Sequence, residues 1–323
     1  MTSLHFLDRR DVQRICSGQS VVDLATAVKE LVENALDAGA TQIEVKLIEM
    51  GRDSIEVSDN GAGVARENYG TLAQKHCTSK ISHFEDIASV TSFGFRGEAL
   101  SSICALAASF KICTRTQSDA VGALLEYDAL GNLMKETKKA RPVGTTVAVE
   151  GLFKPLAVRS KDFQRNIKKH YTKLLKVLQG YAVSCVNVKL SVFNSSKNVS
   201  RQVVLATQAQ QTMGENIASV FGTKFFRTLL SVDVSLHEEF ENRANDTTDE
   251  ARDEESEELE RKSADNALSQ RQWNVVGYVS KVGAGVGRSD SDRQFFFING
   301  RPFDLPKVLK QSCGGSLVLC AEW

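Results

Sequence analysis

The sequence predicts an α/β sandwich, in which helices pack on one face of a sheet, followed by a second domain. Two patterns carry this prediction: short segments alternate apolar and polar residues, and segments with helical spacing of apolar residues lie between and after them. The chain has 323 residues, 42% hydrophobic and 25% charged. A chain of this length and composition can bury a substantial core and is typical of a soluble globular protein.

The predicted elements follow one another in a clear order. Residues 21–38 are predicted to form a helix, which Gly39 ends. Strands are predicted at 43–47, 55–57 and 147–149. A second helical stripe consists of Phe163, Ile167, Tyr171, Leu174 and Leu178. Residues 61–97 are rich in Gly, Ser and Thr, and we expect them to form a mobile lid.

A carboxylate and an amide share one face of the first helix. Glu30 and Asn34 are four residues apart, so they lie on the same side of a helix. A carboxylate beside an amide oxygen suits a general base next to a Mg²⁺ ligand. Glu33 and Asp37 fall on the neighbouring face, where a surface or structural role is expected.

Two later segments add an acceptor and an anion site. Asp59, followed by Asn60 and Gly61, ends a predicted strand in a turn and leaves a carboxylate able to accept a hydrogen bond. Residues 93–100 read FGFRGEAL and precede a helix predicted from Glu98. Glycines before a helix N-terminus let backbone N–H groups approach a phosphate closely.

In this order, the three segments resemble the GHKL ATPases, a class that includes gyrase, Hsp90, histidine kinases and the MutL mismatch-repair proteins. Three blocks are similar to MutL: KELVENALDAGA at 29–40, HCTSKI at 76–81 and GFRGEALSS at 94–102. Three more resemble the eukaryotic PMS-type subunit: ICSGQ at 15–19, FQRNIKK at 163–169 and DRQFFFINGRP at 292–302. The resemblance implies a GHKL (Bergerat) fold that binds and hydrolyses ATP with Mg²⁺.

The resemblance also assigns roles within the site. It implies that Glu30 is the catalytic base, Asn34 the Mg²⁺ ligand and Asp59 the acceptor of the adenine amino group. The remaining nucleotide contacts that it implies are Gly63, Thr78, Ser79, Lys80, Gly94, Phe95, Arg96, Gly97, Glu98, Ala99, Leu100 and Thr145. Gly63 lets the base pack closely, and the backbone N–H groups of 94–100 clasp phosphate.

The implied partners are a MutL-homologue subunit in a heterodimer, a MutS-type mismatch-recognition complex and double-stranded DNA, in the nucleus. A basic flank beside the second helical stripe consists of Arg159, Lys161, Arg165, Lys168, Lys169 and Lys173. It could follow a DNA backbone or be a solvated helix face, and both interpretations stay open. No apolar run reaches the ~18 residues of a membrane span, so no membrane association is expected.

The expected domains are a GHKL ATPase domain at 1–214 and an incomplete, ribosomal-protein-S5-like transducer domain at 215–310. An acidic insert is expected at 238–265, and 238–262 hold 12 acidic against four basic residues. Without them, the net charge of 0 becomes a surplus of 36 basic over 28 acidic residues, a mild indication of an anionic partner. The tail, 311–323, matches nothing expected.

Two hypotheses about function remain. In the first, ATP closes an N-terminal clamp on DNA. In the second, the chain is a truncated, non-hydrolysing module that binds ATP, DNA or a MutL partner. MutL proteins carry an Asn-Val-x-Pro-x-Lys segment whose Lys reaches the γ-phosphate, and the sequence contains none. It also lacks the PMS-type endonuclease region.

An incomplete second sheet should leave an open edge near 294–298 and favour aggregation. A histidine kinase needs a phosphate-accepting histidine on a helix before the ATP-binding motif. Only His5 precedes that motif here, with no room for such a helix, so this alternative is set aside.

Overall fold

The computed structural model describes residues 6–78, 80, 92–94, 97–196, 199–238, 271–283, 291–303 and 317–322. The chain divides into two compact units, Met1–Phe226 and Arg227–Trp323, and each is described by itself. The first unit therefore extends beyond residue 214, to the end of a short helix at Thr223–Phe226. The domain limits expected from the sequence stay a prediction. Apart from its first residue, the acidic insert lies outside the described residues. So do Ser79, Phe95 and Arg96.

The first unit is built on an eight-stranded sheet with the order β5-β4-β3-β6-β2-β1-β7-β8. Its strands are β1 (Gln42–Ile48), β2 (Ser54–Asp59), β3 (Ser109–Arg115), β4 (Gly122–Tyr127), β5 (Leu133–Lys139), β6 (Gly144–Glu150), β7 (Lys189–Ser196) and β8 (Val199–Ala206). Neighbouring strands are antiparallel except β1 and β7, which are parallel. The three strands predicted in this part of the chain are β1, β2 and β6, and all three are confirmed.

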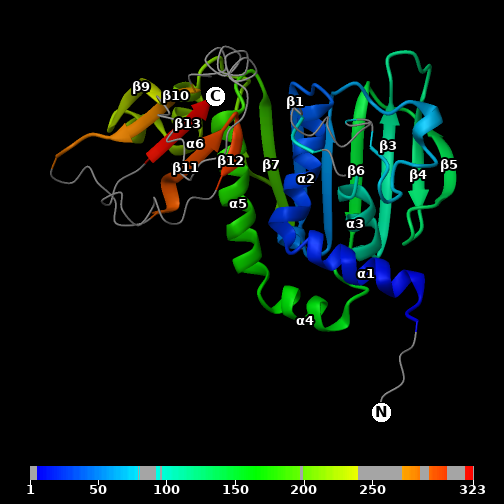
Figure 1. Ribbon diagram of the computed structural model, residues 1–323. Coiled ribbons are helices and arrows are strands. Elements are labelled where there is room, and N and C mark those ends of the chain that lie inside the picture. Colours follow the sequence, from blue (N-terminus) through cyan, green and yellow to red (C-terminus); the bar gives the residue numbers. More distant parts are fainter. Residues whose placement is uncertain are drawn as a thin grey trace, which may run out of the picture. The chain divides into compact units, whose positions relative to one another are not determined.

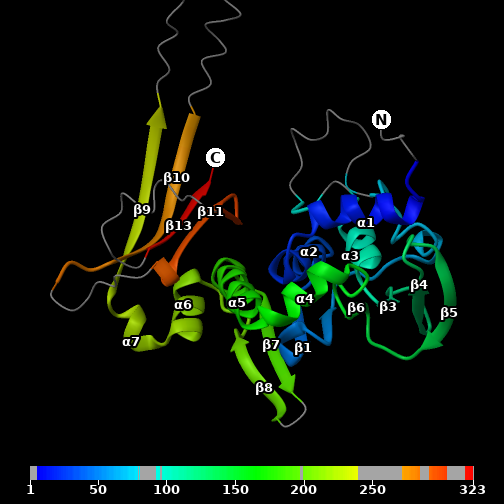
Figure 2. The ribbon, with the colours of Figure 1, turned by 90° about the horizontal axis from the view of Figure 1, so that it is seen from below.

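Helices cover one face of this sheet, as Figures 1 and 2 show, so the predicted sandwich is confirmed. The helices of this unit are α1 (Arg9–Ser20), α2 (Leu24–Asp37), α3 (Ala99–Leu106), α4 (Ala157–Arg165), α5 (Ile167–Ser184), α6 (Met213–Phe221) and α7 (Thr223–Phe226). Short 3-10 turns occur at Glu49–Gly51 and Arg66–Asn68. Among the described residues, no helix combines the length and apolar character needed to cross a membrane.

Helix α2 forms where the sequence predicts it, from a defined cap to a glycine stop. The Oδ1 atom of Asp23 accepts hydrogen bonds from the backbone N–H (2.8 Å) and hydroxyl (2.9 Å) of Thr26, so the helix begins at Leu24. At the other end, Gly39 adopts φ +72°, a left-handed conformation that glycine tolerates. The apolar side of the helix is buried at Leu24, Ala25, Ala27, Val28, Leu31, Val32 and Ala35. Burial of the apolar side turns Lys29, Glu30 and Asn34 toward the segments that follow β2 and precede α3.

The second helical stripe is confirmed, but it belongs to two helices. Asn166 breaks the pattern between α4 and α5, with φ −103° and ψ 19°. Phe163 of α4 is buried against Phe153, with ring centroids 5.4 Å apart. The stripe continues in α5, where Leu174 and Leu178 are fully buried. The apolar spacing therefore marks the buried side correctly across a change of helix axis.

The second unit contains a five-stranded sheet with the order β12-β11-β13-β10-β9. Its strands are β9 (Leu229–Glu238), β10 (Arg271–Ser280), β11 (Gln294–Ile298), β12 (Arg301–Phe303) and β13 (Leu317–Glu322), with a 3-10 turn at Ser291–Arg293. The sequence patterns at 232–236, 275–279 and 294–298 predict strands in this second domain, and β9, β10 and β11 confirm them. The S5-like classification stays a prediction.

The open edge predicted near 294–298 is wrong. Strand β11 lies between β12 and β13, pairing antiparallel with β12 and parallel with β13. Strand β13 comes from the tail that matched no expected pattern, and it also pairs antiparallel with β10. The physical reason is local: Leu317–Cys320 is an apolar run of β-forming residues, which is able to add a strand wherever a sheet offers unpaired backbone groups.

Replacing Asp23 by Ala should lower the free energy of unfolding by about 0.5–2 kcal/mol, because the α2 cap is lost. Burial opposes ionisation of this carboxyl, but hydrogen bonds from Lys173 (2.6 Å) and Thr26 outweigh it and lower its pKa. A lowered folded-state pKa stabilises the protein above the ordinary Asp pKa, and this stability is lost as the pH falls through the folded value. Urea unfolding at pH 7 and pH 3 measures both effects.

The control is Asp23→Asn, which keeps an acceptor for Thr26 but removes the charge facing Lys173. It should lose less stability than Asp23→Ala at pH 7, and its difference from the parent should shrink at pH 3. Equal stability of all three proteins at pH 7 would contradict the capping role.

Candidate functional site

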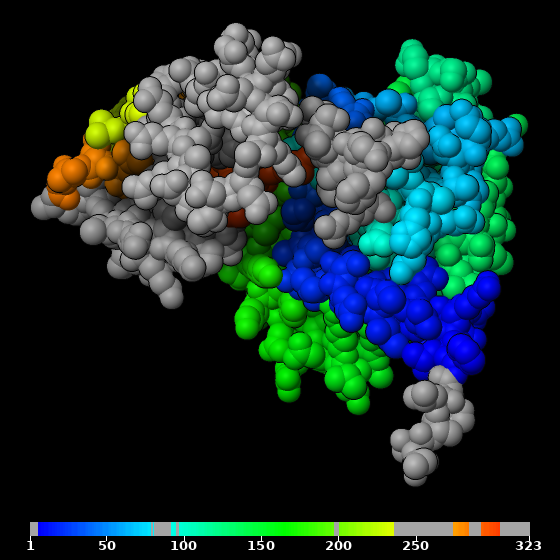
Figure 3. Space-filling model, in the orientation of Figure 1, coloured from blue at the N-terminus to red at the C-terminus, as the bar shows by residue number. Residues whose placement is uncertain are grey.

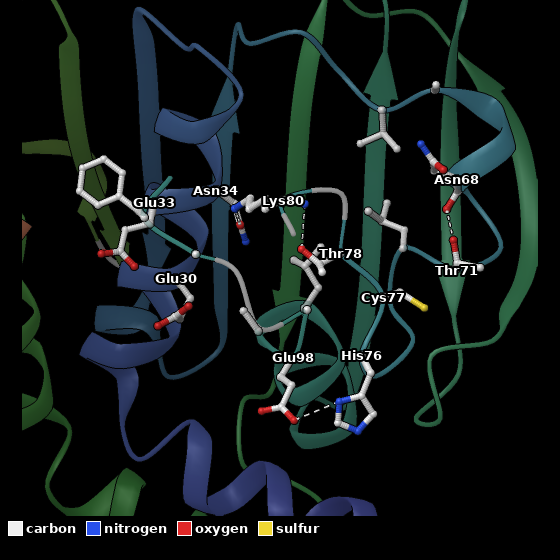
Figure 4. A pocket seen from close by; sticks show the side chains of 18 of the residues that line it. Glu30, Glu33, Asn34, Asn68, Thr71, His76, Cys77, Thr78, Lys80 and Glu98 are labelled. Carbon is white, nitrogen blue, oxygen red and sulfur yellow. Dashed lines mark hydrogen bonds and ion pairs between the residues drawn. The ribbon is translucent and has the colours of Figure 1, made fainter. Parts of the chain in front are cut away.

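A cavity of about 850 Å³ opens between α2, the chain that follows β2 and the beginning of α3 (Figure 4). Ten of the predicted nucleotide-site residues line it: Glu30, Asn34, Gly63, Thr78, Lys80, Gly94, Gly97, Glu98, Ala99 and Leu100. Lys29, Glu33, Asn68, Thr71 and His76 complete its polar lining. The fold therefore brings the three sequence segments together around one space.

Two predicted residues lie outside this lining and contact each other on adjacent strands. The Oδ1 atom of Asp59, at the end of β2, accepts hydrogen bonds from the N–H groups of Gly61 (2.8 Å) and Thr145 (3.1 Å). Its Oδ2 atom accepts no hydrogen bond from the part of the chain that the structure describes. Burial raises the pKa of this carboxyl, although the two N–H groups oppose the shift. One oxygen thus remains to receive an external donor.

Glu30 lines the cavity, and among the described residues its ion pair is a weak one. The Nζ atom of Lys29 is 3.5 Å from Glu30 Oε1 but 2.7 Å from Glu33 Oε2, so its main partner is Glu33. Glu33 is buried and also accepts a hydrogen bond of 2.5 Å from the hydroxyl of Tyr181. Burial raises the pKa of Glu30, with Lys29 opposing the shift. A raised pKa makes this carboxylate a stronger proton acceptor.

Gly63 lets the chain after β2 lie directly on β3. Its φ is +77°, and a Cβ atom there would lie 2.2 Å from the carbonyl oxygen of Arg115. Beside it, the hydroxyl of Thr114 accepts a hydrogen bond of 2.9 Å from the N–H of Val64 and lies 3.1 Å from the hydroxyl of Thr145. Glycine is therefore required for this wall of the cavity to form.

The beginning of α3 forms the opposite wall. Gly97 adopts φ +61°, and a Cβ atom there would lie 2.5 Å from the carbonyl oxygen of Cys77. Its own carbonyl accepts a hydrogen bond of 3.1 Å from the N–H of His76, whose ring lies 3.5 Å from the Glu98 carboxylate. None of the side chains that the structure describes caps the N-terminus of α3. Its first N–H groups are arranged to bind an anion.

Asp37 belongs to the site, although the sequence argument placed it aside. Its carboxylate is only 6% exposed and accepts hydrogen bonds from Lys80 Nζ (2.5 Å), Phe93 N (2.7 Å) and Gly94 N (3.1 Å). Asp37 follows Asn34 by three residues, which is a helical-face spacing. That signal was present in the sequence, but nothing in it indicated which loop atoms the carboxylate would meet.

The predicted basic flank separates into structural and exposed residues. Arg159 donates hydrogen bonds to the carbonyl oxygens of Gly18, Val21 and Val22, joining α4 to the end of α1. Figure 3 shows these blue and green segments side by side on the surface. Lys173 pairs with Asp23 at 2.6 Å, and Arg165 with Asp162 at 3.2 Å. The side chains of Lys161, Lys168 and Lys169 are exposed. DNA contact by the flank stays a prediction.

Comparison with known proteins agrees with this geometry. Residues 22–148 match the family of histidine kinase-, DNA gyrase B- and HSP90-like ATPases. A crystal structure described as the N-terminal domain of a DNA repair protein superposes with a TM-score of 0.78 at 37% identity, covering 97% of this chain and 86% of that one.

The relatives of this chain are of the PMS type. Mismatch repair endonuclease PMS2 of Homo sapiens is 46% identical over 94% of this chain and 33% of its own length. DNA mismatch repair protein PMS1 of Saccharomyces cerevisiae is 43% identical over 96% of this chain and 34% of its length. The chain belongs to the MutL family of GHKL ATPases. It spans about a third of the length of these relatives. The Aquifex aeolicus MutL ATPase domain complexed with ADP has the same fold, with a TM-score of 0.56 at 24% identity.

Gly63→Ala should lower the free energy of unfolding more than Gly39→Ala does. Both glycines have positive φ, so alanine costs about 1–2 kcal/mol at either position. Only at position 63 would the added methyl also meet backbone, whereas nothing lies within 4 Å of a Cβ atom at position 39. Urea unfolding of both variants separates the steric effect from the conformational one. Equal losses would show that the contact with Arg115 is relieved without cost.

Proposed function

We propose that this chain is a PMS-type mismatch-repair protein that binds ATP with Mg²⁺ and hydrolyses it. The observation that carries the proposal is the cavity itself. It joins a general-base carboxylate, an amide oxygen suited to Mg²⁺ and a helix N-terminus with two glycines. These chemistries fit a nucleoside triphosphate and its metal ion. That a MutL ATPase domain of the same fold has been crystallised with ADP supports the nucleotide.

The cavity and the adjoining end of β2 would each hold a different part of the nucleotide. The Oδ2 atom of Asp59 offers an acceptor to an amino group on a base, and Gly63 allows the base to approach the backbone. The amide oxygen of Asn34 would hold the Mg²⁺, which would neutralise charge on the phosphates. The N–H groups at the beginning of α3 would hold the phosphate oxygens.

Glu30 would act as the general base. It lies one helical turn before Asn34, so it is positioned to take a proton from a water molecule near the metal-held phosphate. Its raised pKa favours this proton transfer. In the part of the chain that the structure describes, the nearest partner of this carboxylate is Lys29 at 3.5 Å, which would leave it available to a water molecule.

Turnover would close an N-terminal clamp on DNA together with a MutL-homologue subunit, within a pathway that a MutS-type complex starts, in the nucleus. The PMS-type relatives support this role, and the exposed lysines at 161, 168 and 169 offer charges to a DNA backbone. The second candidate function is nucleotide binding without turnover. It is favoured by the pairing of the lysines that line the described cavity, Lys29 with Glu33 and Lys80 with Asp37, because an unpaired cation at the γ-phosphate would stabilise charge in the transition state.

Asp59→Ala should abolish ATP binding measured by isothermal titration calorimetry, because the acceptor for the base amino group is lost. Asn34→Ala should weaken binding only in the presence of Mg²⁺, because it removes a metal ligand and leaves the base pocket intact. Titrations with Mg²⁺ and with EDTA distinguish the two effects. Unaltered ATP affinity in both variants would show that the nucleotide does not bind at this site.

Glu30→Gln should retain ATP binding but lower the turnover rate by about 10²- to 10⁴-fold, the usual contribution of a general base. The glutamine keeps the size of the side chain and removes only its basicity. In the parent protein, turnover should fall on acidification at a pH above the ordinary Glu pKa, because burial raises the pKa of Glu30 and only the ionised form accepts a proton.

Steady-state ATP hydrolysis from pH 4.5 to 8.5 measures both effects. Turnover by Glu30→Gln at the parent rate would exclude Glu30 as the base. A parent protein that binds ATP without detectable turnover at any pH would select the second candidate function.

A further inference from the structure

Lys80 donates a hydrogen bond to the amide oxygen of Asn34, the atom proposed above as the Mg²⁺ ligand. The Nζ atom of Lys80 lies 3.1 Å from Asn34 Oδ1 and 2.5 Å from Asp37 Oδ2. Figure 4 shows Lys80 beside Asn34 at the cavity. The side chain of Lys80 is 23% exposed, so this ion pair is largely withdrawn from solvent. An ammonium and a divalent cation cannot share one amide oxygen, because like charges repel strongly where water is excluded.

Asp37 holds the ammonium of Lys80 in this position. Besides the ammonium, its carboxylate receives the N–H groups of Phe93 (2.7 Å) and Gly94 (3.1 Å). A Cβ atom at position 94 would lie 3.2 Å from Lys80 Nζ, so glycine there gives the ammonium its space. Asp37 itself does not line the cavity. It thus holds two groups that do, the Lys80 ammonium and the backbone of Gly94.

We propose that Lys80 is an internal cation that keeps Asn34 Oδ1 occupied in the nucleotide-free protein, and that Asp37 is the positioning residue that holds it there. This inference rests on the proposed function, since the ligand that displaces Lys80 is a nucleotide with Mg²⁺. Phosphate oxygens offer the ammonium a new partner, and its departure frees the amide oxygen for the metal. The site therefore does not load a divalent cation until a nucleotide is present.

The test measures Mn²⁺ binding without nucleotide, by electron paramagnetic resonance on the full chain. The parent protein should show no site that depends on Asn34. Lys80→Met should bind Mn²⁺ at least 10-fold more tightly than the parent, because the Asn34 amide and the Asp37 carboxylate become available together. Lys80→Arg, which keeps the positive charge, should behave like the parent. Adding Asn34→Ala to Lys80→Met should remove the new site.

Equal Mn²⁺ affinity of Lys80→Met and the parent would overturn the inference, as would tight Mn²⁺ binding by the nucleotide-free parent at Asn34. Should Lys80→Met fail to fold, Lys80→Gln makes the same test, because it also removes the charge. Failure of the proposed function is a different outcome. It appears as a parent protein that does not bind ATP with Mg²⁺ in calorimetry, whatever Mn²⁺ does in the variants.

Discussion

The burial of one side of α2 is the constraint on which the site depends. A helix repeats every 3.6 residues, so placing Val28, Leu31 and Ala35 against the sheet fixes the direction of every other side chain. Glu30 and Asn34, one helical turn apart, therefore face the cavity. The capping carboxylate of Asp23 and the stop at Gly39 set the register of the helix ends. The chemistry of the site follows from packing that involves none of the reactive atoms.

Charge in the cavity wall is balanced within the protein before any ligand is present. Lys29 is held by Glu33, and Lys80 by Asp37, each at 2.7 Å or less. Breaking a buried pair by removing one partner leaves an uncompensated charge, which is strongly destabilising. Both lysines are therefore kept in defined places, and within the described part of the chain Glu30 has only the distant contact of Lys29, at 3.5 Å. This division of partners is the basis for proposing Glu30, and not its acidic neighbours, as the general base.

The local parts of this arrangement could be predicted from sequence, and the long-range parts could not. Helix α2, strands β1 and β2, and the shared face of Glu30 and Asn34 all follow from periodicity. The partners of Asp37 could not be predicted, because they depend on how residues 80 and 93–94 return to α2. Strand β13 was missed for a related reason: its pairing with β10 and β11 joins distant segments, and no local pattern records a partner.

Charge counted along a sequence also differs from charge offered to a partner. Arg159 satisfies three carbonyl oxygens at the end of α1 and lies 4.1 Å over the ring of Phe153, which makes it part of the packing. A guanidinium is suited to this role because its five donors lie in one plane. Lysine cannot supply that planar set of donors. Elsewhere in the flank, Lys161, Arg165, Lys168, Lys169 and Lys173 are exposed. Arg165 and Lys173 are paired with carboxylates, so any electrostatic attraction of a DNA backbone by this flank would come mainly from Lys161 on α4 and from Lys168 and Lys169 on α5.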